Sequence, residues 1–97
     1  MKTTKTPEAP NSLKAKVTDA LREAVGAAAD IQLDDVPPDN VGGIVLSRSF
    51  ATQTPGERQD HIWKYLDQHL SPLERPRVTF IVTDTPEEYE ALKKAAG

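Results

Sequence analysis

The sequence predicts an α+β domain with the element order α-β-β-α-β-α, a three-stranded mixed sheet and helices on one face of that sheet. Three observations support this fold class. An apolar stripe at helical spacing follows residue 12, three short apolar and β-branched runs are typical of strands, and Thr-Pro-x-Glu helix starts occur at 54–57 and 85–88. A helix between the second and third strands allows those strands to be parallel, which makes the sheet mixed. A chain of 97 residues is large enough for one modest core.

The N-terminal part divides into a tail and the first helix. Residues 1–11 contain no large apolar residue after Met1, so we expect a disordered tail followed by a single domain at 12–97. From Ser12 onward, apolar residues recur every four positions, which predicts an amphipathic helix packed on a sheet. The stripe consists of Leu13, Val17, Leu21 and Val25.

Two strands and a loop follow the first helix. Residues 30–34 alternate between polar and apolar, which indicates a short, half-buried strand. Two prolines and two glycines within 36–43 predict a loop. Residues 43–50 are predicted to form the second strand, with one face made by Ile44, Leu46 and Phe50.

The second helix is expected to begin after Thr54, with Pro55 in its first turn, and to end near Leu70. Its predicted buried stripe is Ile62, Leu66 and Leu70. Trp63 broadens this stripe, so we expect Trp63 to anchor the core near Ile44 or Phe80.

The third strand is predicted at 77–83, with Val78, Phe80 and Val82 on one face. A final helix starts at the second Thr-Pro-x-Glu segment and is expected to reach the core through Tyr89 and Leu92.

Composition restricts the classes of function. Fifteen acidic and twelve basic residues give a net charge of −3, whereas domains that bind nucleic acid by bulk electrostatics are usually basic. The absence of cysteine excludes disulfides, thiolate metal sites and cysteine nucleophiles. The apolar runs are too short to span a membrane, and the N-terminus lacks the apolar stretch of a signal peptide. We therefore expect a cytoplasmic protein.

Several landmarks occur in a characteristic order. Phe50 is followed thirteen residues later by Trp63, Arg58 lies between them, and the third strand runs into Thr85-Pro86-Glu87-Glu88-Tyr89. Over roughly residues 12–92, this arrangement resembles the BolA-like family, whose fold is related to one form of the KH nucleic-acid-binding domain. The resemblance implies the fold predicted above and a non-catalytic binding or regulatory role.

The resemblance also identifies two positions for metal ligands. In that family, a histidine near the start of the third strand, and a histidine or cysteine in the loop before the second strand, can help a monothiol glutaredoxin partner hold an iron–sulfur cluster. The equivalent positions are Thr79 and a residue near Asn40, which are poor iron ligands. His61 and His69 are about 12 Å apart along one helix and cannot chelate one ion together. We expect no metal site or other cofactor.

Three functions remain open, and the leading one is a protein-interaction adapter, monomeric by itself. The first alternative is a transcriptional or RNA regulator that binds nucleic acid weakly through a KH-like surface. The second is a glutaredoxin partner in iron–sulfur handling. No nucleophile elbow, phosphate-binding loop or histidine–carboxylate constellation predicts an enzyme. Under the nucleic-acid hypothesis, the candidate phosphate contacts are Arg48, Arg58, Arg75 and Arg77.

Overall fold

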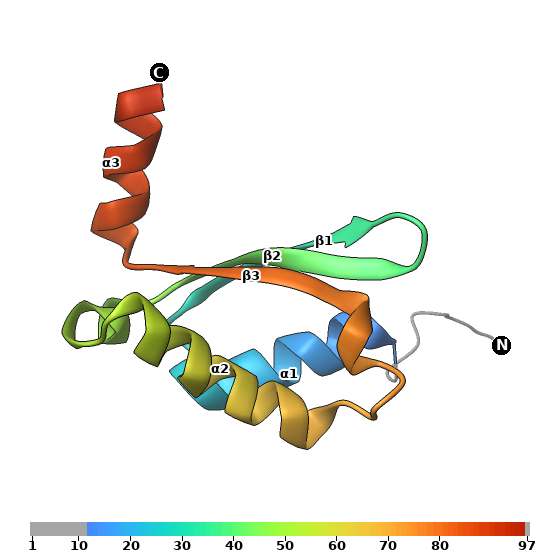
Figure 1. The fold of residues 1–97 in the computed structure, drawn as a ribbon. Helices are drawn as coiled ribbons and strands as arrows, with labels where there is room; N and C mark the ends of the chain where they lie inside the picture. The colour runs from blue at the N-terminus through green and yellow to red at the C-terminus, as the bar shows by residue number, and fades with distance from the viewer. Residues whose placement is uncertain (1–11, 97) are drawn as a thin grey trace, which may run out of the picture.

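The computed structural model describes residues 12–96, and the predicted disordered tail at 1–11 lies outside the described residues. Helices and strands follow the predicted order (Figure 1). One short 3-10 turn precedes the second helix, and another precedes the third strand. None of the helices in this described part is long and apolar enough to cross a membrane. The elements are α1 (Leu13–Val25), β1 (Asp30–Val36), β2 (Asn40–Leu46), η1 (Arg48–Thr52), α2 (Pro55–His69), η2 (Arg75–Arg77), β3 (Val78–Asp84) and α3 (Pro86–Ala96).

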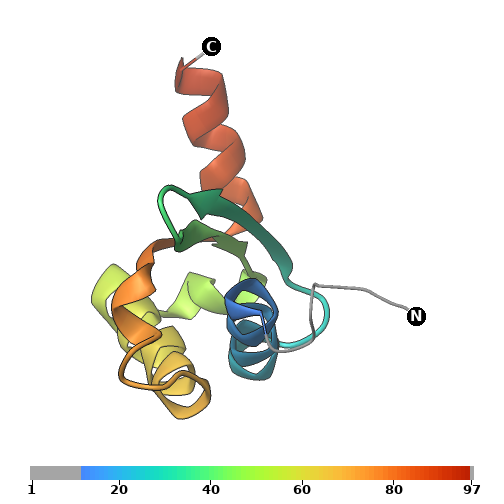
Figure 2. The ribbon, with the colours of Figure 1, turned by 90° about the vertical axis from the view of Figure 1, so that its right-hand side faces the viewer.

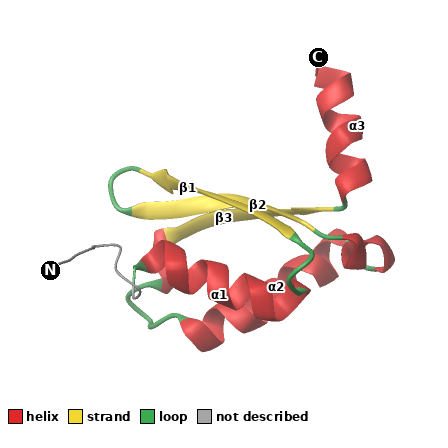
Figure 3. Cartoon of the chain, turned by 180° about the vertical axis from the view of Figure 1, so that it is seen from behind, coloured by secondary structure: helices red, strands yellow, loops and turns green. Residues whose placement is uncertain are grey.

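The three strands form one mixed sheet in the order β1-β2-β3. β1 is antiparallel to β2, and β3 is parallel to β2. α1 and α2 lie side by side across one face of this sheet (Figures 1 and 3). α3 leaves the end of β3 and projects to the opposite side (Figure 2). The predicted fold class is confirmed, with α3 standing apart from the helical layer.

The core lies between the sheet and the α1–α2 layer. Both predicted helical stripes are confirmed, because Val17 and Leu21 of α1 and Ile62 and Leu66 of α2 are fully buried. The predicted helix starts are also present. Ser12 caps α1 by accepting a hydrogen bond from the Ala15 amide, and Thr54 forms a capping box with Glu57. Phe50 and Val45 complete the set of fully buried large side chains.

The faces assigned to the second and third strands were wrong. β2 ends at Leu46, and Phe50 reaches the core from the 3-10 turn η1. The core face of β2 carries Val45, while Ile44 points to the other face. In β3 the buried residues are Val78, Ile81 and Thr83, whereas Phe80 is 49% exposed. A shift of the pairing register between Val41 and Gly42 separates Val78 from Phe80, with which it was expected to share a face. In these strands, residues that point to either face of the sheet are apolar. The alternation of side chains alone therefore does not determine which face is buried.

The predicted role of Trp63 was also wrong. Its side chain is only partly buried at the margin of the core. The indole nitrogen donates to the Gln59 side-chain oxygen at 3.1 Å, and the Arg75 guanidinium lies 4.9 Å from the ring centroid. The aromatic core anchor is therefore Phe50. Leu92, which was expected to reach the core from α3, is 60% exposed.

Candidate functional site

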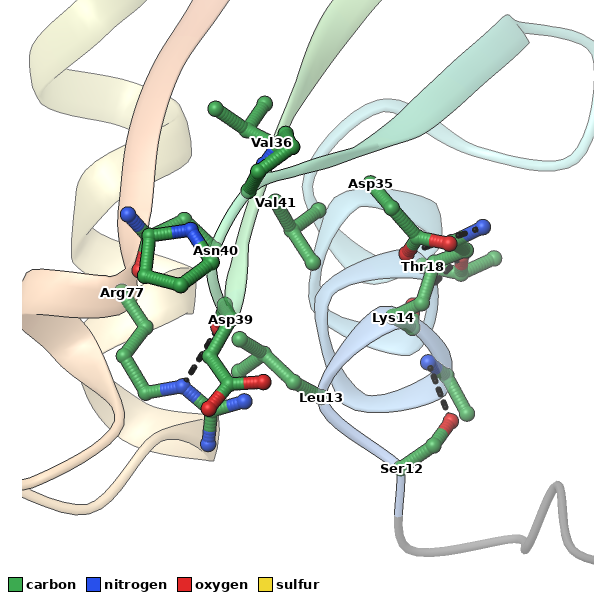
Figure 4. Close-up of a pocket in the computed structure, with 13 residues that line it drawn as sticks. Ser12, Leu13, Lys14, Thr18, Asp35, Val36, Asp39, Asn40, Val41 and Arg77 are labelled. Carbon is green, nitrogen blue, oxygen red and sulfur yellow. Dashed lines mark hydrogen bonds and ion pairs between the residues drawn. The ribbon is translucent and has the colours of Figure 1, made fainter.

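A groove of about 910 Å³ opens where the start of α1, the β1–β2 hairpin and the start of β3 meet (Figure 4). Its walls come from segments distant in sequence, which the fold brings to one end of the sheet. Apolar groups come mainly from the hairpin, and polar groups come from the helix, the hairpin and the 3-10 turn η2. The lining residues are Ser12, Leu13, Lys14, Ala15, Thr18, Asp35, Val36, Pro37, Pro38, Asp39, Asn40, Val41 and Arg77.

Two charged contacts connect the walls of the groove. The Lys14 ammonium lies 3.3 Å from the Asp35 carboxylate, and joins α1 to β1. The Arg77 Nε donates to the Asp39 backbone carbonyl at 2.8 Å, and joins η2 to the hairpin loop. Both contacts are largely exposed, so their net contribution to stability is small. Their main effect is to position a polar rim around the apolar hairpin residues.

Asn40 and Thr79, the two positions that the sequence resemblance related to metal ligands, lie close together at this end of the sheet. Asn40 begins β2 and lines the groove. Thr79 is an extra residue in β3, because Val41 pairs with Val78 and Gly42 pairs with Phe80. The Thr79 hydroxyl donates to the Val41 carbonyl at 3.3 Å. An extra residue of this kind forms a β-bulge, and β-bulges are common beside functional sites.

The donor chemistry at these positions does not fit an iron–sulfur cluster. An amide and a hydroxyl are weak ligands for iron, which favours thiolate and imidazole. Within residues 12–96, no cluster of three or more histidine, cysteine, aspartate or glutamate side chains could hold a metal ion. Asn40 and Thr79 therefore lie close together without side chains that would hold a cluster.

The two histidines connect α2 to α1. The His61 Nε2 donates to the Ala24 carbonyl at 2.7 Å, and its ring contacts Tyr65 edge-on at a centroid distance of 5.4 Å. The His69 Nε2 lies 3.1 Å from the Glu23 carboxylate. Each histidine has its own partner in the folded chain, and the structure gives each a packing role between the helices.

Arg58 is buried and serves the fold. Its Nε donates to the carbonyls of Phe50 and Gln53, at 3.0 and 3.1 Å, and one terminal nitrogen donates to the Thr83 carbonyl at 3.2 Å. Both terminal nitrogens bind the Glu88 carboxylate, at 2.7 and 3.0 Å. This bidentate pair joins α2 to the first turn of α3.

The Glu88 carboxylate is also a helix cap. Hydrogen bonds from Arg58, and next from the Thr85 backbone amide, lower the pKa of Glu88 to about 2. The carboxylate therefore remains ionised across the ordinary pH range. To bind a phosphate group, Arg58 would have to release the Glu88 carboxylate and give up hydrogen bonds to buried backbone carbonyls. Arg58 is therefore poorly placed to contact nucleic acid.

The four candidate arginines are divided between the two ends of the sheet, because Arg58 donates to the Phe50 carbonyl of η1, the turn that carries Arg48. Arg75 forms an ion pair with Asp67 and packs over the Trp63 ring, and Arg77 holds the hairpin loop. Both lie in η2, beside the start of β3. Arg48 is exposed on η1, at the other end of the sheet. The four arginines therefore do not form one continuous basic patch.

No protein-family model matches the chain, and no curated protein matches it. Its structure is similar to the crystal structure of a Bol-like protein from Babesia bovis, with a TM-score of 0.59 and 19% sequence identity. The match covers 82% of this chain and 92% of the Babesia bovis chain. At this identity the likeness establishes the architecture. Together with the element order and the mixed sheet, it shows that the chain has a BolA-like fold.

Proposed function

We infer that the chain is a non-catalytic binding module of the cytoplasm, a protein-interaction adapter without a metal site of its own. The groove is the observation that carries this proposal. It combines the apolar side chains of Val36, Pro37 and Pro38 with a rim that includes Asp39 and Arg77. Protein interfaces typically have such an apolar centre within a polar rim. A loop or helix end of a partner protein is the occupant that this combination favours.

Nucleic acid is the alternative occupant, and the arginines argue against it. Arg58 is committed to Glu88 and three backbone carbonyls. The remaining close pair, Arg75 and Arg77, already contacts Asp67 and the Asp39 carbonyl. Binding a phosphate backbone would have to compete with these contacts and with a net charge of −3. We expect only weak, non-specific association.

A monothiol glutaredoxin is the second alternative partner. The placement of Asn40 and Thr79 beside the groove supports docking of a protein at this end of the sheet. The same two side chains argue against a shared iron–sulfur cluster, because neither is a good iron ligand. A glutaredoxin would therefore be bound here through protein contacts, and we rank cluster handling below the adapter function.

Filling the groove tests the adapter function. Thr18 lines the groove from the second turn of α1, so Thr18→Arg should obstruct it without entering the core. Tagged protein is used to capture partners from nuclease-treated extract of its native cells, with quantification by mass spectrometry. Wild type should enrich a discrete protein, and Thr18→Arg should reduce that enrichment at least about tenfold, as expected when an arginine is forced into a packed interface.

Gln68→Arg is the matched control, because Gln68 is exposed on α2 and the charge change is the same. This control should retain the captured protein. Equal enrichment by both variants would show that the groove is not the binding site. Capture that occurs only from a parallel extract without nuclease treatment would favour the nucleic-acid alternative.

A further inference from the structure

A second surface of the domain is independent of the groove. It is the open face of the sheet, on the side away from α1 and α2 (Figure 1). Strand pairing arranges this face in rows of side chains that cross all three strands. The row nearest the hairpin is Asp34, Gly42 and Phe80, and the next row is Gln32, Ile44 and Val82.

The open face has an apolar centre and an acidic edge. Phe80 is 49% exposed and lies over Gly42, since a Cβ at Gly42 would come within 2.5 Å of the Phe80 ring. Val82 is also exposed. Along β1, the exposed residues on this face include the carboxylates Asp30 and Asp34. An occupant of this face should therefore present an apolar side chain beside positive charge.

α3 of the same chain has this chemistry. Its first turn is fixed by the Arg58–Glu88 pair, whereas residues 90–95 are all exposed. Leu92 is 60% exposed and is followed by Lys93 and Lys94. Lys93 has a weak pair with Glu90 at 3.9 Å, and Lys94 has no ion pair within residues 12–96. A solvent-exposed leucine beside two lysines complements an apolar face beside two aspartates.

The shape of the molecule allows two copies to exchange these contacts. α3 stands at the end of β3, on the side of the open face (Figures 1 and 2). Phe80 lies near the start of β3 and therefore toward the opposite end of the sheet. Two such L-shaped molecules related by a two-fold axis would face each other, with the α3 of each beside the far end of the other's sheet. Leu92 lies roughly 9 Å along α3 at 1.5 Å per residue. Packed sheets are about 10 Å apart, which is close to this rise along α3. Leu92 of one copy would therefore lie next to the sheet of the other copy, beside its Phe80.

We propose that the chain forms a symmetric homodimer through its open faces. Leu92 of each copy packs on Phe80 of the other, and Lys93 and Lys94 face the acidic β1 edge that includes Asp34. In a two-fold interface each contact occurs twice, so one substitution removes two contacts. The dimer leaves the groove at the hairpin end of each copy as a separate site, and this proposal does not depend on the adapter function.

Sedimentation equilibrium of the full chain tests the dimer. Wild type should approach twice its chain mass of 10.6 kDa as concentration rises. Leu92→Glu places a charge in the interface and should raise the dissociation constant at least about tenfold. The control is Leu73→Glu, because Leu73 is 86% exposed between α2 and η2 and should leave dimerisation unchanged. Circular dichroism should show that both variants are folded.

A charge exchange tests the orientation. Lys94→Glu should weaken the dimer, and adding Asp34→Lys in the same chain should restore it, because the exchanged charges still attract. A wild type that remains monomeric up to roughly millimolar concentration, beyond a typical weak affinity, would overturn the proposal and assign the open face to another occupant. A dimer that is insensitive to Leu92→Glu, or equally sensitive to Leu73→Glu, would also overturn it.

Discussion

Replacing Phe50 with alanine is expected to destabilise the domain by about 3–5 kcal/mol. The Phe50 ring is fully buried and belongs to the central cluster that includes Ile62 and Leu66. Removing it would lose the hydrophobic transfer free energy of the ring and leave a cavity that the surrounding side chains only partly fill. Urea unfolding followed by circular dichroism would measure the loss, which is a large part of the stability of a domain of this size.

Phe80→Ala is the matched control for this prediction. It deletes the same ring from the open face, where the side chain is already 49% exposed. The expected loss is below about 1.5 kcal/mol, because much less apolar area returns to water. Equal losses for Phe50→Ala and Phe80→Ala would contradict the assignment of strand faces and of the core. Measurements at low micromolar concentration keep association between copies from contributing.

Arg58→Met is expected to cost about 3–5 kcal/mol, because it leaves buried backbone carbonyls without a donor, at roughly 1–3 kcal/mol each. Methionine retains an apolar stem but cannot donate to the carbonyls of Phe50, Gln53 and Thr83. It also releases Glu88, which holds the first turn of α3. Amide hydrogen exchange should therefore increase in α3 as well as across the domain.

Arg48→Met provides the comparison for Arg58, because Arg48 is an exposed arginine on the neighbouring turn η1. Surface substitutions of this kind usually change stability by less than about 0.5 kcal/mol. If Arg58→Met unfolded at the same urea concentration as wild type, Arg58 would not be a structural brace. Arg58 would then again be a candidate for contacting phosphate groups.

The packing of α1 and α2 was predictable because each has a single apolar stripe. Val17 and Leu21 in α1, and Ile62 and Leu66 in α2, are buried as their spacing indicates. The strand faces were not predictable in the same way. Ile44 and Val45 are adjacent in β2, as are Phe80 and Ile81 in β3, so both faces are apolar and alternation gives no preference. The direction taken by the chain after β3, which sets α3 apart, has no local sequence signal.

The site was less predictable than the fold because its residues come from distant segments. Nothing near Thr18 or Arg77 indicates that they line one groove. The position of Arg58 in the sequence did indicate that it is buried and paired. It lies four residues before Ile62 and therefore on the buried stripe of α2, where a charged residue needs a partner. The partner, Glu88, could not be identified because it belongs to a different helix, thirty positions along the chain.

Titration of labelled single-stranded RNA and DNA with the protein, followed by fluorescence anisotropy, tests the central claim most directly. That claim is that the arginines serve the fold and that the module binds protein in preference to nucleic acid. The measurements would be made at about 50 and 150 mM salt, where phosphate contacts give a steep dependence of affinity on salt. We expect dissociation constants no tighter than roughly 1 μM at the higher salt, as in non-specific binding, and little change in Arg75→Ala or Arg77→Ala. A sub-micromolar complex at the higher salt, with a salt slope that falls by about one unit when either arginine is removed, would contradict the account.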